Sequence, residues 1–306
     1  MDEHGKSTES DLWTEPEFAS NGEVQLAYDR MARSGGTEPL LLIMGLAASR
    51  FWWPDGLCRA FADQGFAVAR YDQRDAGAST HLPDTSGSHP FVSVLRRRGN
   101  PYSAEDMADD AVAVLDGLGW DSAHLFGHSL GGAVAQRVAL RHPGRVRTLT
   151  VSSSLSSDVA GFRATRYIRL GTLGKFARIK FPDTREGRID GALAMARIIA
   201  SPGYEFDEAV WRAGIERDVD TSLADDKAQS RQVGARWSGP KLAELDVPTL
   251  VLHGEQDPLL RPSAARATAA AIRGARLIVR PGVGHDLPGP LWENVAAEVR
   301  ALADSR

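Results

Sequence analysis

The sequence predicts an α/β fold in which a mostly parallel central sheet is flanked by helices and carries an inserted helical lobe. Short apolar runs, typical of buried strands, alternate with helix-like segments in the first half of the chain. Between about 155 and 240 the pattern changes to helices and loops with many arginines and scattered aromatic residues. From Val247 the alternation of strands and helices resumes, so the lobe interrupts one sheet domain.

The elements before the lobe follow from hydrophobic patterning. A weakly alternating edge strand is expected at 24–28, and continuous apolar runs predict buried strands at 40–44, 67–71, 123–126 and 146–151. Helices are expected at 57–62, 103–118 and 133–140. The helix over 103–118 is the clearest, because Ser103 can cap it, acidic residues fill its first turn and one of its faces is apolar.

The same criteria give the elements after the lobe and the division into domains. Strands are expected at 249–253 and 276–279, and helices at 263–272 and 291–302. The chain then divides into a flexible N-terminal arm, a two-part α/β core and a helical cap, which cover residues 1–17, 18–154 with 241–306, and 155–240.

Composition restricts the compartment and the partners. The N-terminal arm lacks the apolar region of a signal peptide, and no apolar run reaches the length of a membrane span. The single cysteine, Cys58, cannot form an internal disulfide. These features predict a soluble cytoplasmic protein. The net charge of −4, without a basic stripe, argues against nucleic-acid binding, and a small molecule is the expected partner of a monomer or a homodimer.

Ser129 lies in a run of residues that predicts a catalytic nucleophile. Gly127-His128-Ser129-Leu130-Gly131 is a G-x-S-x-G nucleophile elbow with an apolar strand before it and a helix-like run after it. A sharp turn between strand and helix leaves no room for side chains at the flanking positions, which explains the glycines. The alternative is a structural turn that carries a surface serine, because a motif match alone is a hypothesis.

Asp257 and His285 are the expected partners of Ser129. A serine hydroxyl needs a base, and the base needs an acid that orients it. In elbow enzymes the chain order is serine, acid, histidine, and both residues follow the last two predicted strands. Parallel strands bring the loops at their carboxyl ends to one crevice. Alternatively, Asp257 starts a turn and Glu255 is the acid, or His285 is a surface histidine.

Two backbone N–H groups are candidates for an oxyanion hole. The Leu130 N–H lies at the N-terminus of the helix after the elbow and faces charge that develops on a bound carbonyl. The Leu46 N–H is the second candidate, in the loop after the first buried strand, where Gly45 permits a tight backbone path. No histidine pair has metal-ligand spacing with acidic partners, so neither a metal nor another cofactor is expected.

From about residue 20 to its end, the chain resembles the α/β-hydrolase fold enzymes of the serine esterase type. The elbow, the Asp257 turn and the His285 loop stand where that family has its triad. Met44-Gly45, Trp53-Pro54-Asp55 and the segments 70–75 and 111–117 are most similar to the anthracycline methylesterases of polyketide tailoring. Asp75 departs from the usual D-x-R-G-x-G-x-S form of the structural segment at 72–79, and Met44 replaces a common histidine.

The resemblance implies a cofactor-free hydrolase that cleaves a carboxylic ester through an acyl-enzyme. The expected substrate is a bulky natural product, polyketide or macrolide-like, that is covered by the cap. A longer loop is expected at 88–102, near the site mouth, where it would make the pocket differ from that of the family. Candidate substrate contacts are Gly45, Trp52, Trp53, His128 and Tyr167. A lactonase, a carbon–carbon hydrolase or a perhydrolase would use the same triad. The alternative that is not an enzyme is a receptor that binds a small molecule without turnover. Haloalkane dehalogenases and epoxide hydrolases need a carboxylate where Ser129 stands.

Overall fold

One sheet organises the structure, a computed structural model that describes residues 12–32, 35–83, 101–159, 161–223, 225 and 227–305. It has eight strands in the order β1-β2-β4-β3-β5-β6-β7-β8. The first two neighbouring pairs, β1 with β2 and β2 with β4, are antiparallel, and all others are parallel. The predicted α/β class with a mostly parallel sheet is therefore confirmed. The strands are β1 (Glu17–Asn21), β2 (Val24–Arg30), β3 (Glu38–Ile43), β4 (Phe66–Tyr71), β5 (Ala123–His128), β6 (Val146–Ser152), β7 (Thr249–Gly254) and β8 (Arg276–Arg280).

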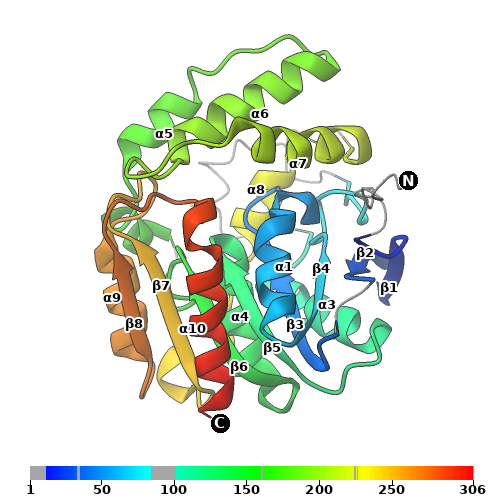
Figure 1. The fold of residues 1–306 in the computed structure, drawn as a ribbon, viewed down its shortest axis with the longest axis vertical. Coiled ribbons are helices and arrows are strands. Elements are labelled where there is room, and N and C mark those ends of the chain that lie inside the picture. The colour runs from blue at the N-terminus through cyan, green and yellow to red at the C-terminus, as the bar shows by residue number, and fades with distance from the viewer. Residues whose placement is uncertain are drawn as a thin grey trace, which may run out of the picture.

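Helices cover both faces of the sheet (Figure 1). On one face lie α1 (Asp55–Asp63) and α10 (Trp292–Asp304), and on the other α3 (Ala104–Gly117), α4 (Leu130–Arg141) and α9 (Pro262–Ala271). The central strand β3 contributes to both cores, because alternate side chains point to opposite faces. Leu40 and Leu42 pack in the cluster with α1 and α10, whereas Leu41 and Ile43 pack in the cluster with α3 and α4.

The lobe between β6 and β7 is helical, as expected. The helices described there are α5 (Leu170–Phe176), α6 (Arg185–Ile199), α7 (Glu208–Thr221) and α8 (Ala228–Gly234), and α5, α6 and α7 lie above the sheet in Figure 1. Short 3-10 segments are η2 (Arg50–Trp52), η3 (Pro143–Arg145), η4 (Gly161–Arg166), η5 (Leu242–Glu244) and η6 (Gly289–Leu291). A small apolar cluster, centred on Leu193 and Ile215, joins α6 to α7. Within the described ranges, none of the helices is both long enough and apolar enough to cross a membrane.

The N-terminal region differs from the expected arm. Residues 1–11 lie outside the described residues, but Trp13 is buried and its indole N–H donates to Asp55 Oδ1 over 2.8 Å. The Arg70 guanidinium lies 3.5 Å from the centre of the Trp13 ring. A cation held over an indole ring is a favourable contact, so within the described residues Trp13 already belongs to the packed domain and not to a flexible arm. The strand expected at the sheet edge, 24–28, is the second strand, because β1 pairs along its outer side.

The segment after β4 braces the strand end, which is the structural role expected for it. Asp72 is fully buried and accepts hydrogen bonds from the Arg50 N–H at 2.6 Å and the Ala78 N–H at 2.9 Å. The Arg50 guanidinium pairs with both Asp72 and Asp29. These buried charges are paired and hydrogen-bonded, which is the condition under which a protein interior tolerates them. The network fixes the loops that follow β3 and β4.

Gly131, near the start of α4, has no room for a side chain. A Cβ there would lie 2.0 Å from the Ile43 carbonyl oxygen, and backbone atoms cannot rotate away. We expect Gly131→Ala to lower the free energy of unfolding by about 1–3 kcal/mol, the usual cost of overpacking. Gly144→Ala is the control, because a Cβ there meets nothing within 4 Å. Urea denaturation measures both variants, and equal stability of the two would contradict this prediction.

Candidate active site

The structure brings Ser129, His285 and Asp257 into one hydrogen-bonded line. The His285 Nε2 atom lies 3.0 Å from Ser129 Oγ, and the Nδ1 atom lies 2.7 Å from Asp257 Oδ2. In the tautomer that satisfies both bonds, Nδ1 donates to the carboxylate and Nε2 accepts from the hydroxyl. This is the arrangement in which an imidazole can take the proton of a serine hydroxyl.

Ser129 has the strained backbone of an elbow. Its φ of 54° and ψ of −122° lie outside the regions that residues with a side chain normally adopt. The turn is possible because the neighbouring backbones approach closely: a Cβ on Gly127 would lie 2.3 Å from the Gly131 carbonyl oxygen. The Ser129 N–H donates to the Ser152 carbonyl on the adjacent strand β6 over 2.9 Å. The side chain is thereby held at the carboxyl end of β5, facing His285.

Asp257 is held as a buried carboxylate. Its Oδ1 atom accepts from the Leu259 and Leu260 N–H groups at 2.7 and 2.8 Å. Burial alone would raise its pKa, but the charge and hydrogen bond of His285, together with the hydrogen bond from the Leu260 N–H, outweigh burial and hold the pKa of Asp257 below its ordinary value. Asp257 is therefore ionised at neutral pH and can stabilise a positive charge on His285. Glu255, the alternative acid, is exposed.

The loop that carries His285 is fastened to the lobe. The His285 N–H donates to the Ile199 carbonyl at the end of α6 over 2.9 Å. Ser201 Oγ accepts from the Gly284 N–H at 2.8 Å and donates to Asp286 Oδ1. A Cβ on Gly284 would lie 2.6 Å from the Ala200 carbonyl oxygen, so only glycine permits this contact. Sequence reasoning missed Ser201, whose role depends on a neighbour far along the chain.

The loop after β3 lies beside the elbow, where an oxyanion hole is expected. A Cβ on Gly45 would lie 3.1 Å from the Ser129 Cβ, so the two backbones are in close contact. Among the described residues, the Leu46 and Leu130 N–H groups have no hydrogen-bond partner. Backbone donors that are unpaired next to a nucleophile can bind the oxygen of an acyl-transfer intermediate.

His128 lies next to the triad and is neutral at neutral pH. Its ring centre is 5.1 Å from that of His285, and its Nδ1 atom lies 3.1 Å from Ser152 Oγ. Burial, with a smaller contribution from His285, lowers the pKa of His128 to about 3. Because His128 stays uncharged, it does not oppose a positive charge on His285.

The three aromatic candidates for substrate contacts all pack within the protein. Trp52 donates from its indole to Asp218 Oδ2 over 2.7 Å and meets the Trp211 ring edge-on, so it anchors α7. Trp53 is only 1% exposed and packs against Phe126 and His128. Tyr167 is 6% exposed, and its carbonyl accepts from the Arg261 N–H. Trp53 and Tyr167 offer a ligand almost no surface, so substrate contact does not follow from their positions, whereas the contact expected of the half-buried Trp52 stays a prediction.

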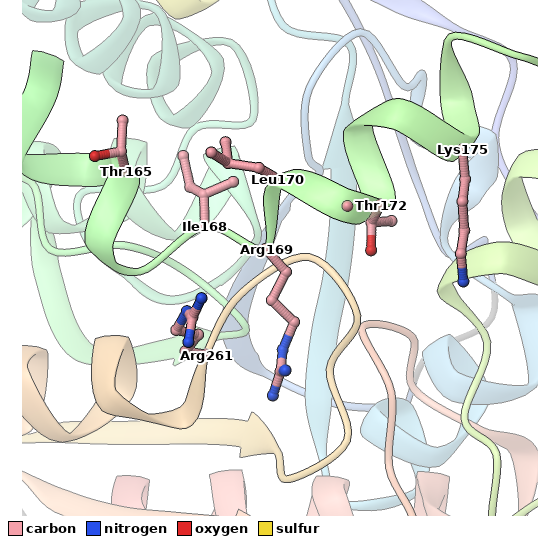
Figure 2. A pocket seen from close by; sticks show the side chains of 8 residues that line it. Thr165, Ile168, Arg169, Leu170, Thr172, Lys175 and Arg261 are labelled. Atoms are coloured by element: carbon pink, nitrogen blue, oxygen red, sulfur yellow. The ribbon is translucent and has the colours of Figure 1, made fainter.

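A cavity of about 450 Å³ lies between the start of α5 and the loop after β7. Figure 2 shows the side chains of Arg169, Lys175 and Arg261 along it. Its other lining residues are Thr165, Ile168, Leu170, Gly171 and Thr172. Ser129, His285 and the other predicted site residues are not among those that line this cavity, so it is not the place where a carbonyl carbon would meet Ser129. Residues 88–100 of the loop expected at the site mouth lie outside the described residues.

The structure also gathers metal-capable side chains that the sequence did not single out. Donor atoms of Asp75, His81 and Asp225 lie within 4.8 Å of one another. Arg231 pairs with both carboxylates, and its Nε atom lies 2.7 Å from Asp75 Oδ2. The arginine already supplies the positive charge that a cation would bring, so this cluster is an ion-pair network between the lobe and the core.

The fold and the site define the class of protein: the chain belongs to the α/β hydrolase fold family, whose model matches residues 38–288. It is similar to the rhodomycin D methylesterase DauP of Streptomyces sp. (strain C5), with 30% identity over 86% of this chain and 90% of the relative. Its identity to the rhodomycin D methylesterase DnrP of Streptomyces peucetius is 29%, over 92% and 96% of the two chains.

Solved structures agree with the fold. The esterase RhEst1 from Rhodococcus sp. ECU1013 superposes with a TM-score of 0.68 at 22% identity, covering 95% of this chain and 98% of its own. The enol-lactonase from Burkholderia xenovorans LB400 superposes with a TM-score of 0.64 at 23% identity, and the match covers 94% of this chain and 98% of the enol-lactonase. The predicted resemblance to α/β-hydrolase fold enzymes and to methylesterases is confirmed, and the predicted class of carboxylic ester hydrolase agrees with these relatives.

The lowered pKa of His128 predicts a pH-dependent stability. Between about pH 6.5 and about pH 3 the unfolded chain binds a proton at His128 that the native protein does not, so stability falls as pH falls through this window. The variant His128→Asn is uncharged throughout. We expect its free energy of unfolding to improve relative to wild type as pH decreases from about 7 to about 4, as measured in urea. A difference that stays constant with pH would show that His128 does not carry this effect.

Proposed function

We propose that this protein is a serine esterase that cleaves a carboxylic ester through an acyl-enzyme on Ser129. The observation that carries the proposal is the continuous line from Asp257 through His285 to Ser129 Oγ, with separations of 2.7 and 3.0 Å. The low pKa of Asp257 supports it, because an ionised acid keeps the His285 ring in the tautomer that can accept the serine proton.

In the first half of the reaction, His285 takes the Ser129 proton while Oγ attacks the ester carbonyl carbon. The carbonyl oxygen becomes negatively charged and is held by the N–H groups of Leu46 and Leu130. When the tetrahedral intermediate collapses, the bond to the alcohol oxygen breaks and His285 gives its proton to that oxygen. The acyl group remains on Ser129.

In the second half, water replaces the alcohol. His285 takes a proton from the water, whose oxygen attacks the acyl carbon, and the charge again develops between Leu46 and Leu130. Collapse breaks the bond to Ser129 Oγ, which regains the proton from His285. The products are a carboxylic acid and the free enzyme. Every step uses side chains and backbone groups of this chain.

The substrate that we propose is the methyl ester of a bulky natural product, polyketide or macrolide-like. The two relatives named rhodomycin D methylesterases support this choice. A cap over residues 155–240 supports it too, since α6 and α7 pack on the loop after β3 through Trp52. We propose that Gly45 and the half-buried His128 contact the substrate, because both lie beside Ser129.

Ser129→Ala tests the mechanism. We expect turnover of p-nitrophenyl acetate to fall by about 10⁶-fold, because the nucleophile and its base act as one unit. The fold should persist, since the alanine Cβ takes the place of the serine Cβ, and circular dichroism checks this. A fluorophosphonate should label wild type once, at Ser129, and leave the variant unlabelled. Near-normal turnover by the variant would overturn the mechanism, and binding without turnover by wild type would favour a receptor.

A substrate panel tests the proposed ester. We expect kcat/KM to be about tenfold or more higher for the methyl ester of a polycyclic polyketide than for a small methyl ester, because remote binding energy raises the rate at the reacting bond. Mass spectrometry identifies the acid and methanol. Preferred hydrolysis of macrocyclic lactones or of carbon–carbon bonds would instead assign one of the other activities that use this triad.

A further inference from the structure

A glutamine of the lobe holds the loop that carries the predicted oxyanion donor. Gln232, on α8, is 1% exposed, and its Oε1 atom accepts from the Ala47 N–H over 2.8 Å. Its Nε2 atom donates to the Arg74 carbonyl over 2.8 Å. One buried side chain thus joins the loop after β3 to the loop after β4. A buried amide that uses both of its ends is a rigid connector, because any movement leaves a polar group unpaired.

A second glutamine holds the other end of the same loop. Gln73 Nε2 donates to the Met44 carbonyl over 2.6 Å. Only Gly45 and Leu46 lie between the two anchored peptides, so the direction of the Leu46 N–H is tightly restricted. Ala47 has a φ of 51°, a left-handed conformation that residues with a side chain rarely adopt. The hydrogen bond from Ala47 to Gln232 opposes relaxation of this strained turn.

The residue before Gln232 fixes α8 to the core. Arg231 Nε and Nη2 donate to the two oxygens of Asp75 at 2.7 and 2.8 Å, in a bidentate pair. The Tyr102 hydroxyl donates to the same carboxylate over 2.7 Å. Asp75 stands where the family motif usually has glycine, and its φ of 63° is the conformation that glycine would favour. This departure from the motif therefore supplies the acceptor that anchors the helix.

We propose that Gln232 is a positioning residue of the oxyanion hole, through which the docked lobe sets the direction of the Leu46 N–H. This inference rests on the proposed function. Gln232 acts through Ala47 and need not touch the substrate. It follows that the lobe contributes to transition-state stabilisation as well as to substrate choice, and that removal of the Gln232 amide should affect the charged intermediate more than the bound ester.

Gln232→Met tests the proposal, because methionine keeps the length of the side chain and loses both hydrogen-bonding groups. With p-nitrophenyl acetate we expect kcat to fall about tenfold or more, with KM within about twofold of wild type. The affinity for a trifluoromethyl ketone, whose serine adduct carries the oxyanion, should weaken by the same factor as kcat/KM. The control is Gln229→Met on the exposed side of α8, which should match wild type.

The possible outcomes distinguish failure of the positioning role of Gln232 from failure of the proposed function. Unchanged kcat in a folded Gln232→Met, or a lower kcat with unchanged affinity for the ketone, would overturn the positioning role. If that variant does not fold in a urea titration, Gln73→Met removes the other anchor of the loop and is judged by the same readouts. If the Ser129→Ala variant turns over the ester as fast as wild type, the proposed function itself is overturned. Turnover that depends on Ser129 but not on Gln232 or Gln73 overturns only this inference.

Discussion

The site depends on the strained turn at Ser129. A φ of 54° at a residue with a side chain costs on the order of 1–3 kcal/mol and persists only where the surroundings determine it. Here the surroundings are backbone contacts that only glycine allows at Gly127 and Gly131, and a hydrogen bond from the Ser129 N–H to Ser152 on β6. These contacts stabilise the strained turn, so the Ser129 hydroxyl stays directed toward His285.

The lobe is hydrogen-bonded to three loops that surround the proposed site. The Arg169 N–H donates to the Leu259 carbonyl in the loop of Asp257 over 2.8 Å. The Ile199 carbonyl accepts from the His285 N–H, and Gln232 accepts from Ala47. A movement of the lobe would change all three loops together. Under the proposed function, a substrate that displaced the lobe would therefore also alter the geometry of the triad.

Local sequence was enough to predict the parts that depend on strand order. Ser129, Asp257 and His285 follow β5, β7 and β8, and parallel strands deliver such residues to one edge of the sheet. Local sequence was not enough to predict that Trp53 is buried, because the hydrophobic pattern does not show whether a tryptophan in a loop points into the core or toward the site. Nor could it find Gln232, which meets its partner Ala47 185 positions away in the chain. The strand expected at 24–28 is present as β2, but its expected position at the sheet edge was wrong, because the polar strand β1 that pairs with it has little hydrophobic pattern.

A covalent intermediate at Ser129 is the central feature of the proposed mechanism. Rapid quenching of the enzyme with p-nitrophenyl acetate, followed by digestion and mass spectrometry, would reveal it. We expect one acetyl group, on the peptide that contains Ser129, which appears with the first turnover and disappears as the substrate is used up. Turnover without an acylated peptide, or acetyl transfer to a different residue on the reaction path, would contradict it.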